Sequence, residues 1–182
     1  MSSHKWIPWP GIGQVDKGSI SPIVDNRYFR RLSDKRQLAF SYLVFPGATH
    51  DRRQHSMGAY IKTREFTARM VERGFLTKKE ALNLGLYALL HDIGHGPFSH
   101  AAEELLPSKP NGGKFKHEAY SAAIVRGPLK EVIEGHAINQ ANYAVKADEI
   151  ADLLEDRSQA ASIVFWRELI DSQMDADRMD YL

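Results

Sequence analysis

The chain has 182 residues, which suits a single domain able to bury roughly 70% of its unfolded surface. Its 24 Lys and Arg against 23 Asp and Glu leave a net charge of +1, so overall charge favours no class of partner and any anion site must come from a local cluster. The absence of Cys excludes disulfides, thiolate nucleophiles and Cys-based zinc sites. With no signal-peptide pattern and no run near ~20 apolar residues, the protein is expected to be cytoplasmic and not membrane-bound.

The first 24 residues are rich in Pro and Gly and are expected to form an extended entry segment. The domain itself is expected to span residues 25–182. Asp25 is positioned to cap a helix over residues 26–40, and a turn is predicted at Phe45-Pro46-Gly47. The basic residues in this stretch, Arg30, Arg31, Lys35 and Arg36, are interpreted as a solvated helix face rather than a contact with a nucleotide or nucleic acid.

Helical patterns dominate the rest of the chain. One helix is predicted from Arg52 to about Arg73, and Thr77 with Glu80 forms a capping box for a second, mostly apolar and buried helix over residues 78–92. Residues 107–116 are the best loop candidate. Further helices are expected at Ser99–Leu106, His117–Val125, Pro128–Gly135, Ala147–Glu155 and Ser162–Met174. No alternating run is long enough for a sheet, so the predicted fold class is all-α.

Ionisable side chains gather where the buried helix ends. His91 and Asp92 lie at its end, and His95, His100 and His117 follow closely. An ionisable pair at the end of an apolar helix is costly unless a metal or other partners compensate it. Nitrogen and oxygen ligands favour Fe, Mn, Co, Ni or Zn over Mg. The residues alone therefore indicate a divalent metal at His91 and Asp92 and leave the other ligands open.

Four sequence strings resemble, in order, the signature of the HD superfamily: FPGATHDRRQHSMG, LLHDIGHGPFSH, KHE and DADRMDY. The branch that they resemble is the deoxynucleoside triphosphate triphosphohydrolases, to which VDNRYFRRLSDKRQL is also similar. The resemblance covers about residues 16–181. It implies an HD-domain helical bundle with a metal site in its core.

The resemblance also implies roles for individual residues. The metal ligands would be His55, His91, Asp92 and Asp177. The groups at the reacting phosphate would be His95 and His117, with a proton-transferring dyad of His100 and Glu103. The substrate-binding residues would be Arg52 on phosphate, Gln37 and Leu38 on the sugar, and Arg178 and Tyr181 after the last ligand.

The expected function is hydrolysis of a (deoxy)nucleoside triphosphate to nucleoside and tripolyphosphate by a metal-dependent enzyme. An additional Mg²⁺ ion on the substrate phosphates is left open. Two alternatives stay open: a phosphomonoesterase or phosphodiesterase on another nucleotide, and a non-catalytic nucleotide or nucleic-acid binding module. Nothing in the sequence specifically indicates nucleic acid. Homo-oligomers are expected by analogy. Members of the branch continue beyond the position of Leu182, which leaves three interpretations open: a truncated gene, a fragment or a minimal enzyme.

Overall fold

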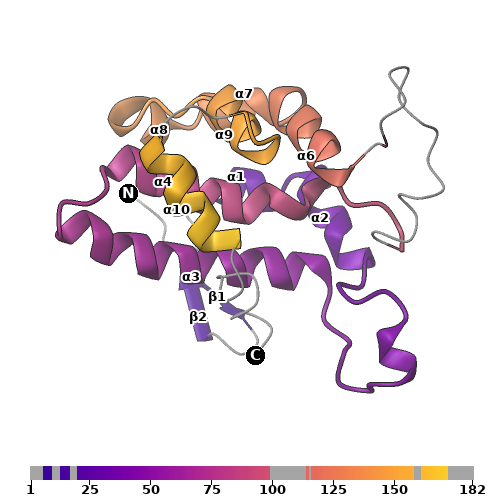
Figure 1. Cartoon of the computed structure of the whole chain (residues 1–182). Coiled ribbons are helices and arrows are strands. Elements are labelled where there is room, and N and C mark those ends of the chain that lie inside the picture. Colours follow the sequence, from indigo (N-terminus) through magenta and orange to yellow (C-terminus); the bar gives the residue numbers. More distant parts are fainter. Residues whose placement is uncertain are drawn as a thin grey trace.

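The computed structural model describes residues 6–9, 13–16, 20–98, 114, 116–157 and 161–171. Helices make up nearly all of the regular structure in these ranges, which confirms the all-α prediction (Figure 1). The exception is a small antiparallel hairpin of β1 (Trp6–Trp9) and β2 (Gly13–Asp16), which the sequence indicated only as extended chain.

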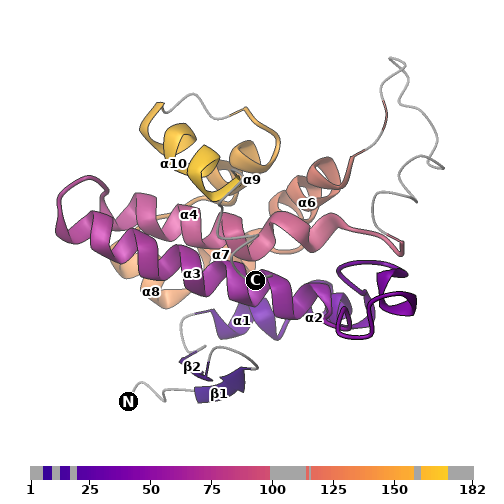
Figure 2. The same ribbon diagram turned by 60° about the horizontal axis from the view of Figure 1, so that its bottom comes forward.

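Two long antiparallel helices form the centre of the fold. Helix α3 (Arg52–Glu72) begins with a capping box at Asp51, and α4 (Lys78–Leu90) begins with the predicted capping box at Thr77. Between them Gly74 adopts a φ of +76°, a left-handed conformation that glycine tolerates at the end of a helix. The two helices lie side by side in both views and share the most extensive contact among the described elements (Figures 1 and 2).

A second group of helices covers α4. It contains α6 (His117–Arg126), α7 (Lys130–Glu134), α8 (Ala137–Asn142) and α9 (Ala147–Leu154), and α10 (Ala161–Asp171) also lies against α4. Four of these five were predicted close to their observed bounds, whereas α8 was not predicted. The helix and loop expected between α4 and α6 lie outside the described residues, apart from residues 114 and 116 of the loop.

The prediction of a single helix over residues 26–40 is wrong. The chain instead forms α1 (Ser21–Val24), α2 (Arg27–Arg30) and the 3₁₀ turn η1 (Arg31–Asp34). Asp25 ends α1, and Asn26 supplies the cap of α2 by accepting a hydrogen bond from the backbone N–H of Tyr28 at 3.0 Å.

The helix ends at η1 because the next segment pairs with the chain entering α3. Arg36 forms an isolated antiparallel bridge with Asp51, and the backbone N–H of Arg52 donates to the Lys35 carbonyl at 2.8 Å. This pairing requires extended backbone, which a continued helix could not provide. It fixes residues 35–37 beside the first turn of α3.

The hydrophobic core lies among α2, η1, α3, α4, α6, α7 and α9. Its largest fully buried side chains include Phe29, Leu32, Met57, Leu84, Leu89, Leu90, Ile93, Leu129, Ile150 and Leu153. Burial of Leu89 and Leu90 continues to the last turn of α4, as its apolar sequence predicted. Within the residues that the structure describes, none of the helices combines the length and apolar character needed to cross a membrane.

Candidate metal centre

Helices α3 and α4 bring three predicted metal ligands together. Helix α4 passes directly into the 3₁₀ turn η3 (His91–Gly94), so His91 and Asp92 extend from a buried helix end. His55, in the first turn of α3, faces them, and the three side chains place ligand atoms within 4.8 Å of one another. The rings of His55 and His91 meet edge to face with centroids 5.4 Å apart. His55 and Asp92 are almost fully buried.

The orientation of the His91 ring suits a metal ligand. Its Nδ1 lies 2.8 Å from the Ala88 carbonyl oxygen, which can only accept, so Nδ1 carries the proton. In a neutral ring Nε2 is then an acceptor, and it lies 3.5 Å from Asp92 Oδ1, another acceptor. A proton or a cation between these two atoms would relieve the repulsion between them. At metal sites, a ligating histidine usually donates a hydrogen bond from its other ring nitrogen to a group such as a backbone carbonyl.

Asp92 is held in its ionised form. Burial alone would raise the pKa of its carboxyl group, but the electrostatic interaction with His91, a hydrogen bond from His95 and the charge of Arg52 together hold that pKa well below its ordinary value. The Arg52 guanidinium bonds Asp92 Oδ2 through Nη1, and His95 Nε2 lies 3.3 Å from Oδ1. A buried carboxylate with this environment can serve as a metal ligand at any physiological pH.

A second group of side chains shares Asp92. Ligand atoms of Asp92, His95 and His117 also lie within 4.8 Å of one another, and the two imidazoles stack with centroids 3.7 Å apart and an interplanar angle of 16°. Burial lowers the pKa of His95 to about 4, so its contact with Asp92 is a hydrogen bond rather than an ion pair at neutral pH. Glu118 Oε2 lies 3.5 Å from His117 Nδ1.

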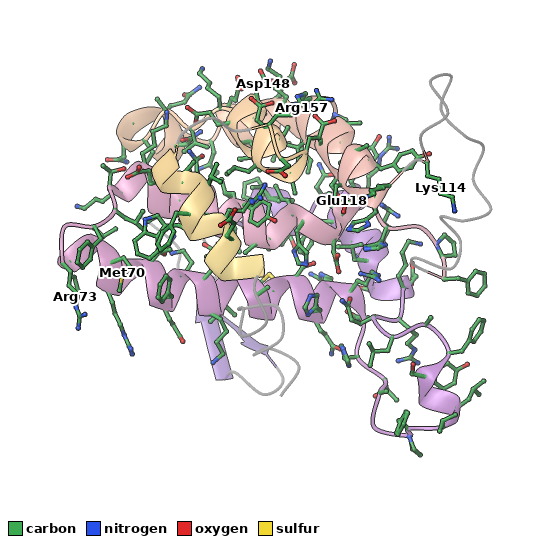
Figure 3. The ribbon with its side chains drawn as sticks, in the orientation of Figure 1. Met70, Arg73, Lys114, Glu118, Asp148 and Arg157 are labelled. Atoms are coloured by element: carbon green, nitrogen blue, oxygen red, sulfur yellow. The ribbon has the colours of Figure 1, made fainter. Side chains whose placement is uncertain are left out.

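The site lies at one end of the long helices. In Figure 3, Glu118 lies near the end of α4, whereas Met70 and Arg73 mark the opposite end of α3. The structure therefore places the predicted residues His55, His91, Asp92, His95, His117 and Arg52 in one cluster at the junction of α3, η3 and α6.

Two further predicted residues lie next to this cluster in the chain segment that precedes α3. The Gln37 carbonyl accepts from Arg52 Nη2 at 3.4 Å, and its buried Oε1 has no hydrogen-bond partner among the described residues. Leu38 follows it and is half-buried. The other predicted site residues, His100, Glu103, Asp177, Arg178 and Tyr181, lie outside the described residues.

Arg31 does not lie on a solvated face, which corrects the sequence-based interpretation. Its Nη1 donates to the His95 carbonyl at 2.9 Å and its Nη2 to the Ile93 carbonyl. Burial lowers the pKa of this guanidinium below its ordinary value. Arg30 and Arg36, from the same basic run, are exposed as expected. Arg31 therefore helps to shape the turn that carries the candidate ligands.

Ser121 is a second residue that sequence reasoning missed. It lies on α6, and its hydroxyl forms hydrogen bonds with backbone groups at both ends of η3. The only signal in the sequence was its spacing of four residues after His117, which places both on one face of a helix. A lone Ser at that spacing is too common to indicate a role.

Comparisons with known proteins agree with this geometry. The family model described as HD domain matches residues 52–182. The Bacillus subtilis protein YwfO is 35% identical over 169 residues, covering 88% of this chain and 34% of its own length. The deoxynucleoside triphosphate triphosphohydrolase SAMHD1 of Gallus gallus is 36% identical over 126 residues, covering 64% of this chain and 20% of its own length.

A solved structure supports the same relationship. A phosphohydrolase from Bacteroides thetaiotaomicron superposes with a TM-score of 0.74 at 31% identity, covering 98% of this chain and 40% of that one. The chain spans roughly a third of the length of the bacterial relatives that it matches.

Proposed function

Because the chain belongs to the HD domain family, we propose that it is a metal-dependent phosphohydrolase that cleaves a (deoxy)nucleoside triphosphate into nucleoside and tripolyphosphate. The observation that carries this proposal is the buried cluster of His55, His91 and Asp92, with Arg52, His95 and His117 around it. The family and the cluster support phosphoester hydrolysis, and the SAMHD1 relative supports the choice of substrate.

The proposed metal ligands are His55, His91 and Asp92, with Asp177 as the fourth. Two neutral imidazoles and two carboxylates balance the charge of a divalent ion, and this donor set suits Fe, Mn, Co, Ni or Zn. When bound, such an ion supplies Lewis-acid chemistry to a phosphate ester. The Ala88 contact that fixes the His91 ring and the groups that keep Asp92 ionised support this assignment.

Arg52 has two proposed tasks. Its guanidinium is buried and bonds Asp92, so it orients the carboxylate and keeps it charged. It also brings positive charge to the cluster, where it would attract the substrate phosphates. Gln37, whose carbonyl accepts from Arg52, is proposed to contact the sugar with Leu38, while Arg178 and Tyr181 would complete the pocket.

His95 and His117 are proposed to contact the reacting phosphate. Because burial keeps His95 neutral above about pH 4, we assign it a hydrogen-bonding rather than a proton-donating role. His117, stacked on His95 and close to Glu118, would hold a phosphate oxygen beside it. Proton transfer to or from the reacting oxygens is assigned to His100 with Glu103.

Chromatography of the reaction products tests the proposal. The purified protein is incubated with the four dNTPs and Mn²⁺, and in parallel with nucleoside monophosphates and cyclic nucleotides. We expect nucleoside and tripolyphosphate from at least one dNTP, and no product from Asp92→Asn. Glu72→Gln, an exposed carboxylate at the far end of α3, is the matched control and should retain activity. Products only from monophosphates or cyclic nucleotides would contradict the triphosphate assignment.

A further inference from the structure

Helix α6 packs against the turn that carries the candidate metal ligands, and Ser121 lies in this contact. Ser121 is fully buried, and its Oγ accepts a hydrogen bond from the Gly94 backbone N–H at 2.8 Å and donates one to the His91 carbonyl at 2.7 Å. His91 and Gly94 are the first and last residues of η3. A single hydroxyl thus bonds both ends of this turn.

Gly94 allows the two elements to approach this closely. A Cβ at Gly94 would lie 2.2 Å from the His117 carbonyl oxygen and 2.4 Å from the Ser121 backbone nitrogen. Both are backbone atoms of α6 and cannot rotate away. The backbone of η3 therefore lies directly against the first turn of α6, and the Ser121 hydroxyl fixes the register of this contact.

The contact joins the two halves of the candidate site. His117 lies one helical turn before Ser121 on α6, so the two side chains share a face. Asp92 lies within η3, between the two residues that Ser121 bonds. Any shift of α6 along η3 would move His117 relative to Asp92 and His95.

Arg31 also contacts this turn, by donating hydrogen bonds to the carbonyls of Ile93 and His95. It donates hydrogen bonds to η3 and to the residue after it, and within the described residues it forms none with α6. Arg31 can therefore fix the shape of the turn, whereas Ser121 fixes the position of α6 against that turn.

We propose that Ser121 is a positioning residue, which sets His117 against His95 and Asp92 through its two hydrogen bonds to η3. Its expected effect on turnover rests on the proposed phosphohydrolase function, but its effect on the position of His117 does not. A misplacement of about 1 Å in a catalytic arrangement can lower a rate by about 100-fold.

The test replaces Ser121 with Ala and compares it with Thr67→Val. Thr67 also carries a buried helix hydroxyl, which donates to the Thr63 carbonyl at 2.8 Å within α3. Both variants lose a buried hydroxyl, so a general loss of stability would affect them alike. Ser121→Cys, close in size to Ser, carries the same test if Ser121→Ala does not fold.

Two quantities are measured. The position of the His117 ring is followed on the Zn²⁺-loaded protein, and turnover is followed on the Mn²⁺-loaded protein. The first is the NMR chemical shift of the His117 ring protons, which ring stacking on His95 displaces. The second is kcat and KM for the dNTP substrate. In Ser121→Ala we expect displaced His117 resonances and a kcat lower by about 10- to 100-fold, with KM changed by less than about twofold. Thr67→Val should change neither.

Unchanged His117 resonances in Ser121→Ala would overturn the proposal, as would displaced resonances with an unchanged kcat. An equal displacement in Thr67→Val would also overturn it, because the effect would then follow general stability. If the wild-type protein hydrolyses no dNTP, the proposed function fails, while the His117 resonances still decide whether Ser121 positions that ring.

Discussion

His95 shows how burial determines the chemistry of a single side chain. It is 1% exposed and contacts the Asp92 carboxylate, which would favour a protonated ring. Burial outweighs that contact and lowers the His95 pKa to about 4. The ring is therefore a neutral hydrogen-bonding group at physiological pH, held between a carboxylate and a second imidazole.

This protonation behaviour predicts a specific acid sensitivity. The unfolded chain binds a proton at His95 near pH 6.5, whereas the folded chain binds it only near pH 4. Between these values the unfolded state holds more protons, so the free energy of unfolding decreases as the pH falls, by up to about 3 kcal/mol. Urea unfolding of the metal-free protein at pH 7 and pH 4 measures this loss. His95→Gln should lose distinctly less stability over the same range, and an equal loss in both proteins would contradict the assignment.

Asp92 is the other residue on which the cluster depends. Arg52, His91 and His95 all approach its two oxygens, and both candidate metal-binding groups include it. A buried carboxylate is stable only while the groups that compensate its charge stay in place. Changes at Asp92 therefore affect every proposed role in the site at once.

At the scale of elements, the backbones of η3 and α6 approach closely at Gly94. Gly94→Ala would place a methyl group against backbone atoms of α6, so either α6 or η3 must move. We expect a loss of about 2–3 kcal/mol in the free energy of unfolding, the range for overpacking at a rigid contact. Gly96→Ala, two residues further, meets no atom within 4 Å and should change stability by less than about 0.5 kcal/mol. Equal unfolding midpoints in urea for the two variants would show that the junction is not rigid.

Elements determined by local signals were predictable from the sequence. The capping box at Thr77 and the glycine after α3 act within a few residues, and both were predicted where they occur. The prediction of a helix over residues 26–40 failed because Lys35 and Arg36 pair with the chain entering α3, and this contact joins segments that are not adjacent in the sequence. Local propensity cannot indicate such pairing.

The candidate site divides in the same way. The association of His55, His91, Asp92 and Arg52 followed from motif resemblance, and the structure places these residues together. The supporting contacts of Arg31 and Ser121 depend on how distant elements pack, and the residue types alone gave no sign of them. Whether the ligand set is complete at Asp177 stays a prediction.

At the scale of the whole molecule, the hydrophobic core and the candidate site occupy different parts of the described helices. The core extends along α3 and α4 and beneath α6 to α9, while the cluster occupies the end where α3 begins and α4 ends. Three elements meet there, and each contributes at least one candidate ligand or phosphate-binding group. Substitutions in the distant half of α3 should therefore alter stability without altering metal binding.

The central claim is that the buried cluster binds a divalent metal, and elemental analysis of the purified protein tests it most directly. Wild-type protein, loaded with Mn²⁺ or Zn²⁺ and then dialysed, should retain the metal in a stoichiometric amount. The His91→Ala/Asp92→Ala double variant should retain none, whereas His136→Ala, a histidine between α7 and α8, should retain as much as wild type. Full metal content in the double variant, or none in the loaded wild type, would contradict the account.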